Sequence, residues 1–353
     1  GPLSYRPLPD RLFRNRGDGT FEDISTRVGI VDYFGGALGV IPADFNGDGV
    51  PDIYVANDGV PNQLWMGGKQ GGFVNRGLIS GTAVNQTGRP EASMGVVAAD
   101  YDADGDEDLF MTHLIRETNT LYSNDGSGFF EDRSLEAGLA RASWEYTGFG
   151  TVWIDFDNDG WLDLLAANGE VKVIPELEAA QDPYPLHQLN SIFRNRGDGT
   201  FEEVSKQGGA AFALSEVSRG IAVGDIDNDG DSDAVLTNNS GPVRLLLNQI
   251  GSQNHWVGLR LVGTDSERPR DMLGAWVGVF VEDRSTLWRR VNSAGSYASA
   301  SDPRILVGLG DSESVDRVEV HWPGGAVEEW NVAIDRYSTL HQGTGKRVSA
   351  SAP

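Results

Sequence analysis

Four short acidic segments place oxygen-bearing side chains at one fixed spacing. Each follows the pattern Asp-x-(Asp/Asn)-x-Asp-Gly-x-x-Asp, and they span residues 44–52, 100–108, 155–163 and 225–233, named loops 1 to 4 below. In a tightly curved backbone, positions 1, 3 and 5 project inward and position 9 closes the far side. Glycine at position 6 permits the sharp reversal that turns the carbonyl of position 7 inward. The pattern therefore predicts a shell of oxygens around a hard cation.

Calcium is the cation that this shell predicts, with about four sites in the chain. Calcium takes six to eight oxygen ligands, whereas magnesium keeps several waters and transition metals usually recruit imidazole or thiolate. None of the five histidines lies in a loop, and the chain has no cysteine. The competing interpretation is an acidic turn without metal. Four copies disfavour it, because three or four crowded carboxylates would repel one another without a cation.

The predicted ligands are the side chains of positions 1, 3, 5 and 9 and the carbonyl of position 7. They are Asp44, Asn46, Asp48, Val50, Asp52, Asp100, Asp102, Asp104, Asp106, Asp108, Asp155, Asp157, Asp159, Trp161, Asp163, Asp225, Asp227, Asp229, Asp231 and Asp233. We expect each ion to be structural and to fix the bend between two strands.

Each loop lies inside a longer repeat. The loops begin 56, 55 and 70 residues apart, and a short apolar run precedes and follows each one, as in residues 38–41 and 53–55. Such runs predict two buried strands joined at the loop. A hairpin signal, clearest in residues 192–201, adds two more strands. Four antiparallel strands in tandem predict an all-β protein with a β-propeller of four-stranded blades.

The same hairpin signal also occurs once before the first complete repeat. Residues 12–21 repeat 192–201 almost verbatim, but no acidic loop precedes them. This orphan hairpin lacks the first two strands of a blade, so we expect that upstream blades are missing from the chain; a smaller propeller is the alternative.

In up-and-down blades, the loops and hairpin turns share one end. The longer segments, including residues 169–190 with a short predicted helix at 175–180, lie at the other.

A second domain is predicted where the repeat stops, after about Asn254. Strand-like runs there cover residues 255–262, 275–282, 304–309 and 315–322. We therefore predict propeller blades at residues 1–253, a small β-domain at 254–344 and a frayed tail at 345–353.

Composition excludes several classes of function. The net charge is −24 and the pI is near 4.4, so nucleic acid is not an expected partner, because phosphate binding needs a clustered basic surface. No run of eighteen apolar residues predicts a membrane span. The absence of cysteine excludes disulfides and thiolate metal sites within this chain. Gly1 to Ser4 looks like a tag remnant or the middle of a longer protein.

The repeats resemble the FG-GAP/VCBS blades of the cartilage acidic protein family, in which an ASPIC/UnbV domain follows the propeller. The segments that carry the resemblance are residues 92–96, 117–122, 155–163 and 224–230 in the blades, and residues 254–256, 273–275, 295–297, 302–304, 308–310 and 320–324 in the second domain. The resemblance implies about seven blades, calcium binding, and a secreted or periplasmic protein. Calcium chemistry agrees, because extracellular modules bind at about 10⁻⁴ to 10⁻³ M and need millimolar calcium. We expect a secreted, cell-surface or periplasmic location.

Two classes of function remain open. The first is a binding or scaffold module for a protein or glycan partner. The second is an enzyme (a hydrolase, isomerase or cyclase) with its site opposite the loops or at the domain junction. No hydrolase elbow, phosphate-binding loop or His-Glu-x-x-His motif supports the enzyme. The side chains that could form an acid–base site are His113, Arg116, Glu117, Glu170 and His187, with Trp144 and Tyr146 as an aromatic contact; a polar rim is the simpler interpretation.

Two short motifs have simple alternatives. The tripeptide Arg-Gly-Asp occurs at residues 16–18 and 196–198, where the hairpin turn itself demands Gly-Asp-Gly. Glycosylation sequons occur at Asn85 and Asn238, and such tripeptides also arise by chance.

Overall fold

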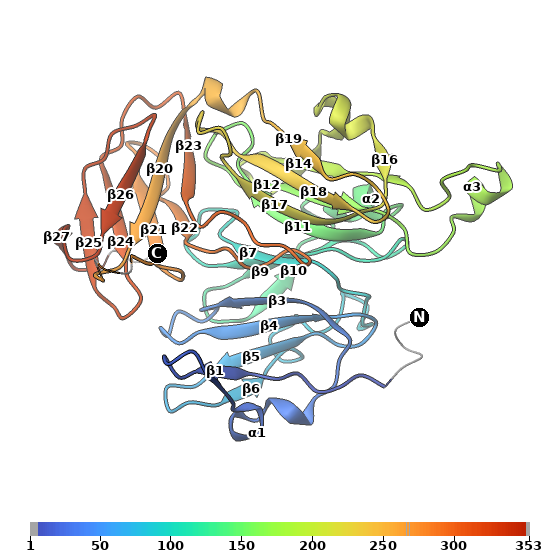
Figure 1. The fold of residues 1–353 in the computed structure, drawn as a ribbon, viewed down its shortest axis with the longest axis horizontal. Helices are drawn as coiled ribbons and strands as arrows, with labels where there is room; N and C mark the ends of the chain where they lie inside the picture. The colour runs from blue at the N-terminus through green and yellow to red at the C-terminus, as the bar shows by residue number, and fades with distance from the viewer. Residues whose placement is uncertain (1–5, 266, 268, 351–353) are drawn as a thin grey trace.

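The computed structural model describes residues 6–265, 267 and 269–350, and strands dominate it (Figure 1). Four sheets follow one another along the chain, and each carries one acidic loop between its first two strands. In Figure 1 the colour passes from blue through cyan and green to yellow as the chain moves from sheet to sheet. No helix in the described ranges is long and apolar enough to cross a membrane.

The sheets are built from strands of three to seven residues. The first contains β3 (Ala37–Ala43), β4 (Asp52–Asn57), β5 (Gln63–Gly67) and β6 (Phe73–Asn75); the second β7 (Val96–Ala99), β8 (Asp108–Met111), β9 (Thr120–Asn124) and β10 (Phe130–Asp132); the third β11 (Gly148–Ile154), β12 (Asp163–Asn168), β14 (Ser191–Asn195) and β15 (Phe201–Glu203); the fourth β17 (Ser218–Gly224), β18 (Asp233–Asn238) and β19 (Arg244–Leu246). All neighbours are antiparallel. The fourth sheet has three strands because the chain turns into the next domain after β19.

Shorter elements lie at the edges. The orphan hairpin forms its own two-stranded sheet, and a second small sheet joins two other segments. The strands are β1 (Phe13–Asn15) with β2 (Phe21–Asp23), and β13 (Gln188–Leu189) with β16 (Ser215–Glu216). The helices are α1 (Ser25–Val28), α2 (Leu139–Ser143), α3 (Pro175–Ala179), and the 3₁₀ turns η2 (Ile30–Asp32), η3 (Ser205–Gln207), η4 (Ala210–Ala213) and η5 (Gly251–Gln253). The short helix expected at residues 175–180 is thus confirmed.

The inner strands β3, β7, β11 and β17 lie side by side in chain order, as in propeller blades. Glycines make this approach possible: a Cβ on Gly95 would lie 2.0 Å from the Phe149 carbonyl oxygen, and one on Gly150 would lie 2.6 Å from that of Arg219. Apolar side chains fill the space between consecutive blades, such as Ile41 of one blade against Leu109 of the next. The predicted all-β chain of propeller blades is confirmed.

The C-terminal domain contains two sheets with one apolar core between them. One sheet has the order β23-β20-β26 and the other β22-β21-β24-β25-β27. The core includes Val257, Leu259, Val277, Val320 and Trp322. Its strands are β20 (His255–Val262), β21 (Trp276–Phe280), β22 (Leu287–Arg290), β23 (Ile305–Gly310), β24 (Arg317–His321), β25 (Val327–Trp330), β26 (Tyr337–His341) and β27 (Lys346–Arg347).

One segment of this domain, residues 291–304, crosses the inner strands of the blades. Ser296 forms an antiparallel bridge with Val96 of β7, and its hydroxyl accepts the N–H of Thr151 in β11 at 3.1 Å. Farther along, the N–H of Asp302 donates to the carbonyl of Val223 in β17 at 3.0 Å. The C-terminal domain is therefore fastened to three blades at once (Figure 1).

Candidate metal sites at the domain junction

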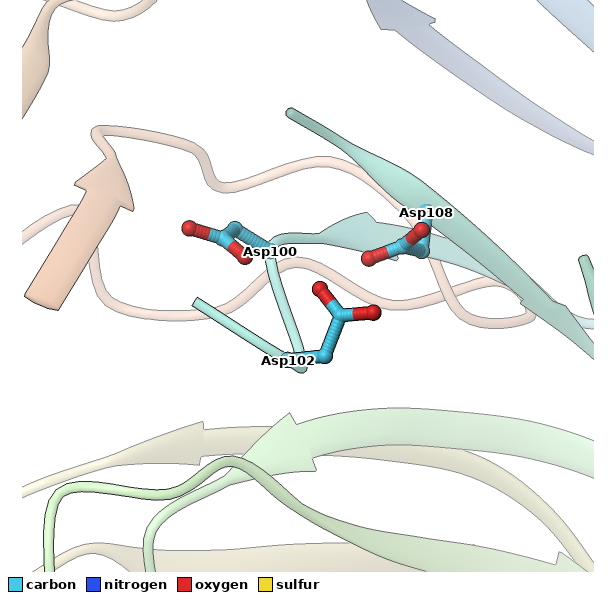
Figure 2. Close-up of side chains that lie close together, drawn as sticks. All are labelled: Asp100, Asp102 and Asp108. Carbon is cyan, nitrogen blue, oxygen red and sulfur yellow. The ribbon is translucent and has the colours of Figure 1, made fainter. Parts of the chain in front are cut away.

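Three of the four loops bring their carboxylates together. One oxygen of each residue lies within 4.8 Å of the others in the sets Asp100–Asp102–Asp108, Asp155–Asp157–Asp163 and Asp225–Asp227–Asp229. Figure 2 shows the first set, where three side chains face a common space at the ends of β7 and β8. This arrangement can hold a metal ion.

Loop 1 differs from the other three loops. No set of three acidic side chains is gathered there within the described residues, because Asn46 occupies position 3 and offers an amide oxygen. Its backbone is nevertheless folded like the others. The carboxylate of Asp44 accepts the N–H of Asp48 at 3.1 Å and that of Gly49 at 2.7 Å. A site in loop 1 stays a prediction.

The carboxylate of position 1 folds each loop around itself. In loop 2, Asp100 accepts the N–H groups of Asp104 and Gly105, both at 3.2 Å. Gly105 has φ 99°, in the left-handed region that a side chain disfavours. The same bond from the position 6 glycine recurs in loops 3 and 4, at 3.0 Å in each. The carboxylate gathered with positions 1 and 3 is that of position 9 in loops 2 and 3, and that of position 5 in loop 4. The predicted ligands Asp104, Asp159 and Asp233 lie outside these sets.

Position 9 has a role that the sequence did not reveal. Asp108 accepts the N–H of Tyr101 at 3.3 Å with one oxygen and the N–H of Asn124 at 2.9 Å with the other. Asp163 does the same with Phe156 and Asn195, at 3.1 and 2.8 Å. This residue therefore ties the loop to the third strand of its blade, besides its predicted role as a ligand.

An asparagine at the end of the third strand joins neighbouring blades. The amide of Asn124 donates to Phe45 O in loop 1 at 2.9 Å and to Glu107 O in loop 2 at 3.2 Å. Asn195 repeats this between loops 2 and 3, and Asn248 reaches Phe156 O in loop 3 at 2.7 Å. The available signal was the recurring asparagine that opens each hairpin turn. Loops and hairpin turns thus share one end of the blades.

Burial and mutual repulsion make the loops poor places for uncompensated charge. Burial raises the pKa of Asp100 to about 8 and that of Asp155 to about 7, with Arg289 opposing the rise in both. Burial and then the charge of Asp104 raise the pKa of Asp102 to about 6. A bound cation would reverse these shifts by favouring the ionised carboxylates.

Several loop oxygens are buried without a hydrogen-bond partner in the described part of the chain. They are Oδ1 of Asp102, Asp106, Asp155, Asp157, Asn158 and Asp231, and Oε2 of Glu107. Buried acceptors of this kind require a donor or a cation. The donor set consists of carboxylate and carbonyl oxygens, so it fits a hard divalent ion such as calcium.

The C-terminal domain covers the loop end of the blades. Arg284 donates to Asp159 O at 2.7 Å and Arg289 to Gly160 O at 2.8 Å, both in loop 3. Arg304 donates to Asp225 O in loop 4 at 2.7 Å. The sequence identified these loops as a face of the propeller, but no sequence signal connected them to arginines more than seventy residues away.

A cavity of about 180 Å³ lies between the inner strands and this domain. Asp100, Asp155 and Asp225 line it from the blades, and Arg290 lines it from β22. Arg290 Nε is 2.6 Å from Glu107 Oε1, while Arg290 Nη2 and Glu107 Oε2 are buried with no partner in the described ranges. Trp153 Nε1, Arg289 Nε and Asp155 Oδ1 also belong to lining residues and are buried without a partner in the described ranges. The cavity lining therefore has several unpartnered donors and acceptors.

Most of the polar side chains at the opposite end are hydrogen-bonded to neighbouring backbone or side-chain atoms. His113 is buried, and burial lowers its pKa to about 3. Glu117 accepts the N–H of Ala92 at 2.9 Å, Glu170 accepts the hydroxyl of Thr147 at 2.6 Å, and His187 Nδ1 lies 2.7 Å from Ser215 O. His113 and Glu170 are thus buried rather than part of an exposed rim, and neither ring nitrogen of His113 has a hydrogen-bond partner among the described residues.

Arg116 and the two sequon asparagines, Asn85 and Asn238, also make hydrogen bonds within the fold. Arg116 has φ 67° and donates its backbone N–H to Trp144 O at 2.8 Å. The amides of Asn85 and Asn238 donate to Glu91 and Glu216, each at 2.9 Å. Both sequon side chains are thus hydrogen-bonded within the fold.

Comparison with known proteins identifies two family matches. Residues 5–55, 44–111, 100–166 and 179–236 match the FG-GAP-like repeat, and residues 263–347 match the family described as ASPIC and UnbV. Cartilage acidic protein 1 of Homo sapiens is 32% identical over 344 residues, which is 94% of this chain and 40% of that protein. Its Xenopus tropicalis counterpart is 32% identical over 174 residues, or 47% of this chain and 26% of that protein. The chain thus spans well under half of these relatives.

Similarity to solved structures is weaker. An exotype rhamnogalacturonan lyase aligns with 99% of this chain and 68% of its own, at 11% identity and a TM-score of 0.34. An Agrocybe aegerita lectin specific for non-reducing terminal N-acetylglucosamine aligns with 70% of this chain and 83% of its own, at 16% identity and a TM-score of 0.30.

Proposed function

The chain belongs to the FG-GAP-like repeat family and carries an ASPIC and UnbV domain. From this premise we propose that it is a calcium-binding module that acts outside the cytoplasm as a scaffold for a protein or glycan partner. The proposal includes a secreted, cell-surface or periplasmic location. It also includes the division into blades at 1–253 and a β-domain from residue 254. The tail predicted at 345–353 is too long, because Lys346 and Arg347 form β27 and pair with β25 of that domain.

The observation that carries the proposal is the set of buried, unpartnered loop oxygens. Asp155 and Asp157 belong to one gathered set, and Oδ1 of each is buried with no hydrogen-bond partner among the described residues. Calcium takes six to eight oxygen ligands of this kind. We assign one ion to each of the four loops, including loop 1, with the ligands predicted from the sequence.

The role assigned to calcium is structural. Each loop joins the first two strands of a blade, and position 9 already ties it to the third strand. An ion that neutralises the crowded carboxylates would stabilise this corner of every blade. Millimolar calcium outside the cell is sufficient for sites with dissociation constants of about 10⁻⁴ to 10⁻³ M.

The partner surface is assigned to the end of the blades opposite the loops. The insertion between β12 and β14 projects from the third blade and carries α3 at its tip (Figure 1). Val171, Val173 and Tyr184 in this insertion are exposed. Exposed apolar side chains on a projecting segment are typical of contact surfaces.

A second candidate function is binding or conversion of a small molecule at the domain junction. The cavity there supports it, because Glu107 Oε2 and Arg290 Nη2 are a buried acceptor and donor without partners in the described ranges. A ligand that bears both a hydrogen-bond donor and an anionic oxygen would satisfy both atoms.

Thermal unfolding in calcium and in chelator tests the main proposal. At calcium concentrations a hundred times the dissociation constant, each site adds about 2.7 kcal/mol of stability. We therefore expect a large rise in the unfolding midpoint with calcium and a smaller one with magnesium. Equal midpoints in calcium and chelator would contradict the proposal.

A further inference from the structure

Two hydrogen bonds from the C-terminal domain end on the first carboxylate of an acidic loop. Gly308 of β23 donates its N–H to Asp155 Oδ2 in loop 3 at 3.1 Å, and the hydroxyl of Tyr337 in β26 donates to Asp225 Oδ2 in loop 4 at 2.9 Å. In each loop, the same Oδ2 atom also accepts the N–H of the position 6 glycine. Oδ2 is therefore held by two donors in each loop. Asp155 Oδ1 has no partner among the described residues, and Asp225 Oδ1 accepts the N–H of Asp229 at 3.2 Å.

The two donors are themselves fixed in place. The guanidinium of Arg304 stacks on the ring of Tyr337, 4.5 Å from its centroid, and donates to Asn228 Oδ1 of loop 4 at 2.7 Å. A Cβ on Gly308 would lie 2.3 Å from the backbone of Asn158, so only glycine permits this approach to loop 3. Two residues farther along β23, the N–H of Gly310 donates to Asn158 O at 2.8 Å.

Loops 1 and 2 provide an internal contrast. The carboxylates of Asp44 and Asp100 accept N–H groups of their own loops. Within the described residues, neither accepts a hydrogen bond from the C-terminal domain. Loop 2 does receive a donor from this domain, but Arg290 Nε donates to Glu107 at position 8 rather than to the first carboxylate. The chain thus contains two loops whose first carboxylate has an added outer donor and two whose first carboxylate has none within the described residues.

We propose that Tyr337 and Gly308 are positioning residues for cation binding, so that loops 3 and 4 bind calcium more tightly when the C-terminal domain is docked. This rests on the proposed calcium binding. Outer partners that orient a ligand commonly change metal affinity 10- to 100-fold. Because the coupling is reciprocal, calcium in these loops also strengthens docking of the C-terminal domain.

The charges on the two sides are compatible with this coupling. Loop 3 carries four aspartates and loop 4 carries five, so one divalent ion leaves each loop negative. Arg284, Arg289 and Arg304 bind backbone carbonyls of positions 5, 6 and 1, whereas the predicted carbonyl ligand is that of position 7. The arginines and the ion therefore use different oxygens, and both are attracted to the same loop.

The test is a calcium titration of the full chain followed loop by loop. The position 6 glycines Gly105, Gly160 and Gly230 each donate to a position 1 carboxylate, so their amide NMR signals report loops 2, 3 and 4 separately. In Tyr337→Phe, we expect the Gly230 signal to require about ten-fold more calcium. The Gly105 signal should titrate as in the wild type. Tyr122→Phe is the matched control, because its hydroxyl donates to Val84 O at 3.1 Å.

Hydrogen exchange provides the reciprocal measurement. The N–H of Asp302 donates to Val223 across the domain junction, and calcium should slow its exchange more in the wild type than in Tyr337→Phe. An unchanged Gly230 titration in Tyr337→Phe would overturn the inference while leaving calcium binding intact. A wild type in which no glycine signal responds to calcium would instead overturn the proposed function. An unchanged Gly105 titration shows that the variant is folded.

Discussion

Residues 13–22 and 193–202 have the same sequence, Phe-Arg-Asn-Arg-Gly-Asp-Gly-Thr-Phe-Glu, but opposite environments. Both form hairpins in the same register. Yet Phe13 and Phe21 are 53% and 60% exposed, while Phe193 and Phe201 are 1% and 7% exposed. The second copy pairs with β12 and packs on the loop of the previous blade, whereas the first forms a two-stranded sheet. Local sequence therefore dictates the hairpin, and the rest of the blade decides whether it is buried.

The two copies of the Arg-Gly-Asp tripeptide belong to the same comparison. Asp18 accepts hydrogen bonds from the N–H and the hydroxyl of Thr20, at 2.9 and 2.6 Å. Asp198 accepts the corresponding bonds from Thr200, at 3.0 and 2.6 Å. These hydrogen bonds lower the pKa of both aspartates. The shared geometry supports the turn interpretation of both tripeptides.

The largest difference between the copies is expected from deletion of the aromatic ring. Phe193→Ala should lower the free energy of unfolding by about 3–5 kcal/mol, because it leaves a cavity in a closed core. Phe13→Ala should change it by less than about 0.5 kcal/mol, as at other exposed positions. Urea unfolding of both variants measures this. Similar losses would mean that the first hairpin is buried in solution.

A smaller difference is expected at the asparagine of each copy. Asn195→Ala removes the amide that donates to Tyr101 O at 2.9 Å and Leu162 O at 3.1 Å. Leaving these carbonyls unsatisfied should cost about 1–3 kcal/mol. Asn15 is exposed, so Asn15→Ala serves as the matched control and should have little effect. Chemical denaturation compares the pair; a neutral Asn195→Ala would rule out the bridge between blades.

Without calcium, the two copies should also respond differently to pH. Burial raises the pKa of Asp155, in the loop beside the second copy, to about 7. Because this value exceeds the unfolded value of about 3.9, the folded state binds the proton more tightly. The resulting stability is complete below about pH 4 and is lost as pH rises through about 7.

Amide exchange tests this response in chelator. After correction for intrinsic exchange, the protection of the Arg196 N–H should fall between pH 5 and 8, whereas that of the Arg16 N–H should not. Calcium should abolish the difference, because it favours the ionised carboxylate. If the protection of both N–H groups fell in the same way with pH, ionisation of Asp155 in loop 3 could not be the cause.

The smallest effect is expected from removing the aspartate of each hairpin turn, and it should be the same in both copies. Asp18→Ala and Asp198→Ala each remove the side chain that holds the turn. Arg16 N–H donates to Thr20 O, and Arg196 N–H donates to Thr200 O, both at 3.0 Å. Both N–H groups should exchange faster by the same factor, on the order of a few-fold. Unequal factors would show that the surrounding blade also shapes the turn.

Much of the fold was predictable because its signals are local. The loop pattern located every bend between the first two strands of a blade, and the predicted strand at residues 255–262 coincides with β20 (His255–Val262). The family resemblance is also confirmed by the matched regions. The three-stranded fourth sheet was not foreseen, because nothing in its sequence marks the point at which the chain leaves for the next domain.

The sequence by itself determined the elements whose hydrogen bonds close within about ten residues: the acidic loops, the glycine reversals and the hairpin turns. Only the tertiary structure decided that Asn195 bridges two blades, that Phe13 is exposed while Phe193 is buried, and that Tyr337 reaches the carboxylate of Asp225. The physical reason is the separation along the chain between the residues that interact. A turn is selected by its own backbone geometry, whereas contacts between residues a hundred positions apart depend on how whole sheets pack, and no periodic pattern in the chain records that packing.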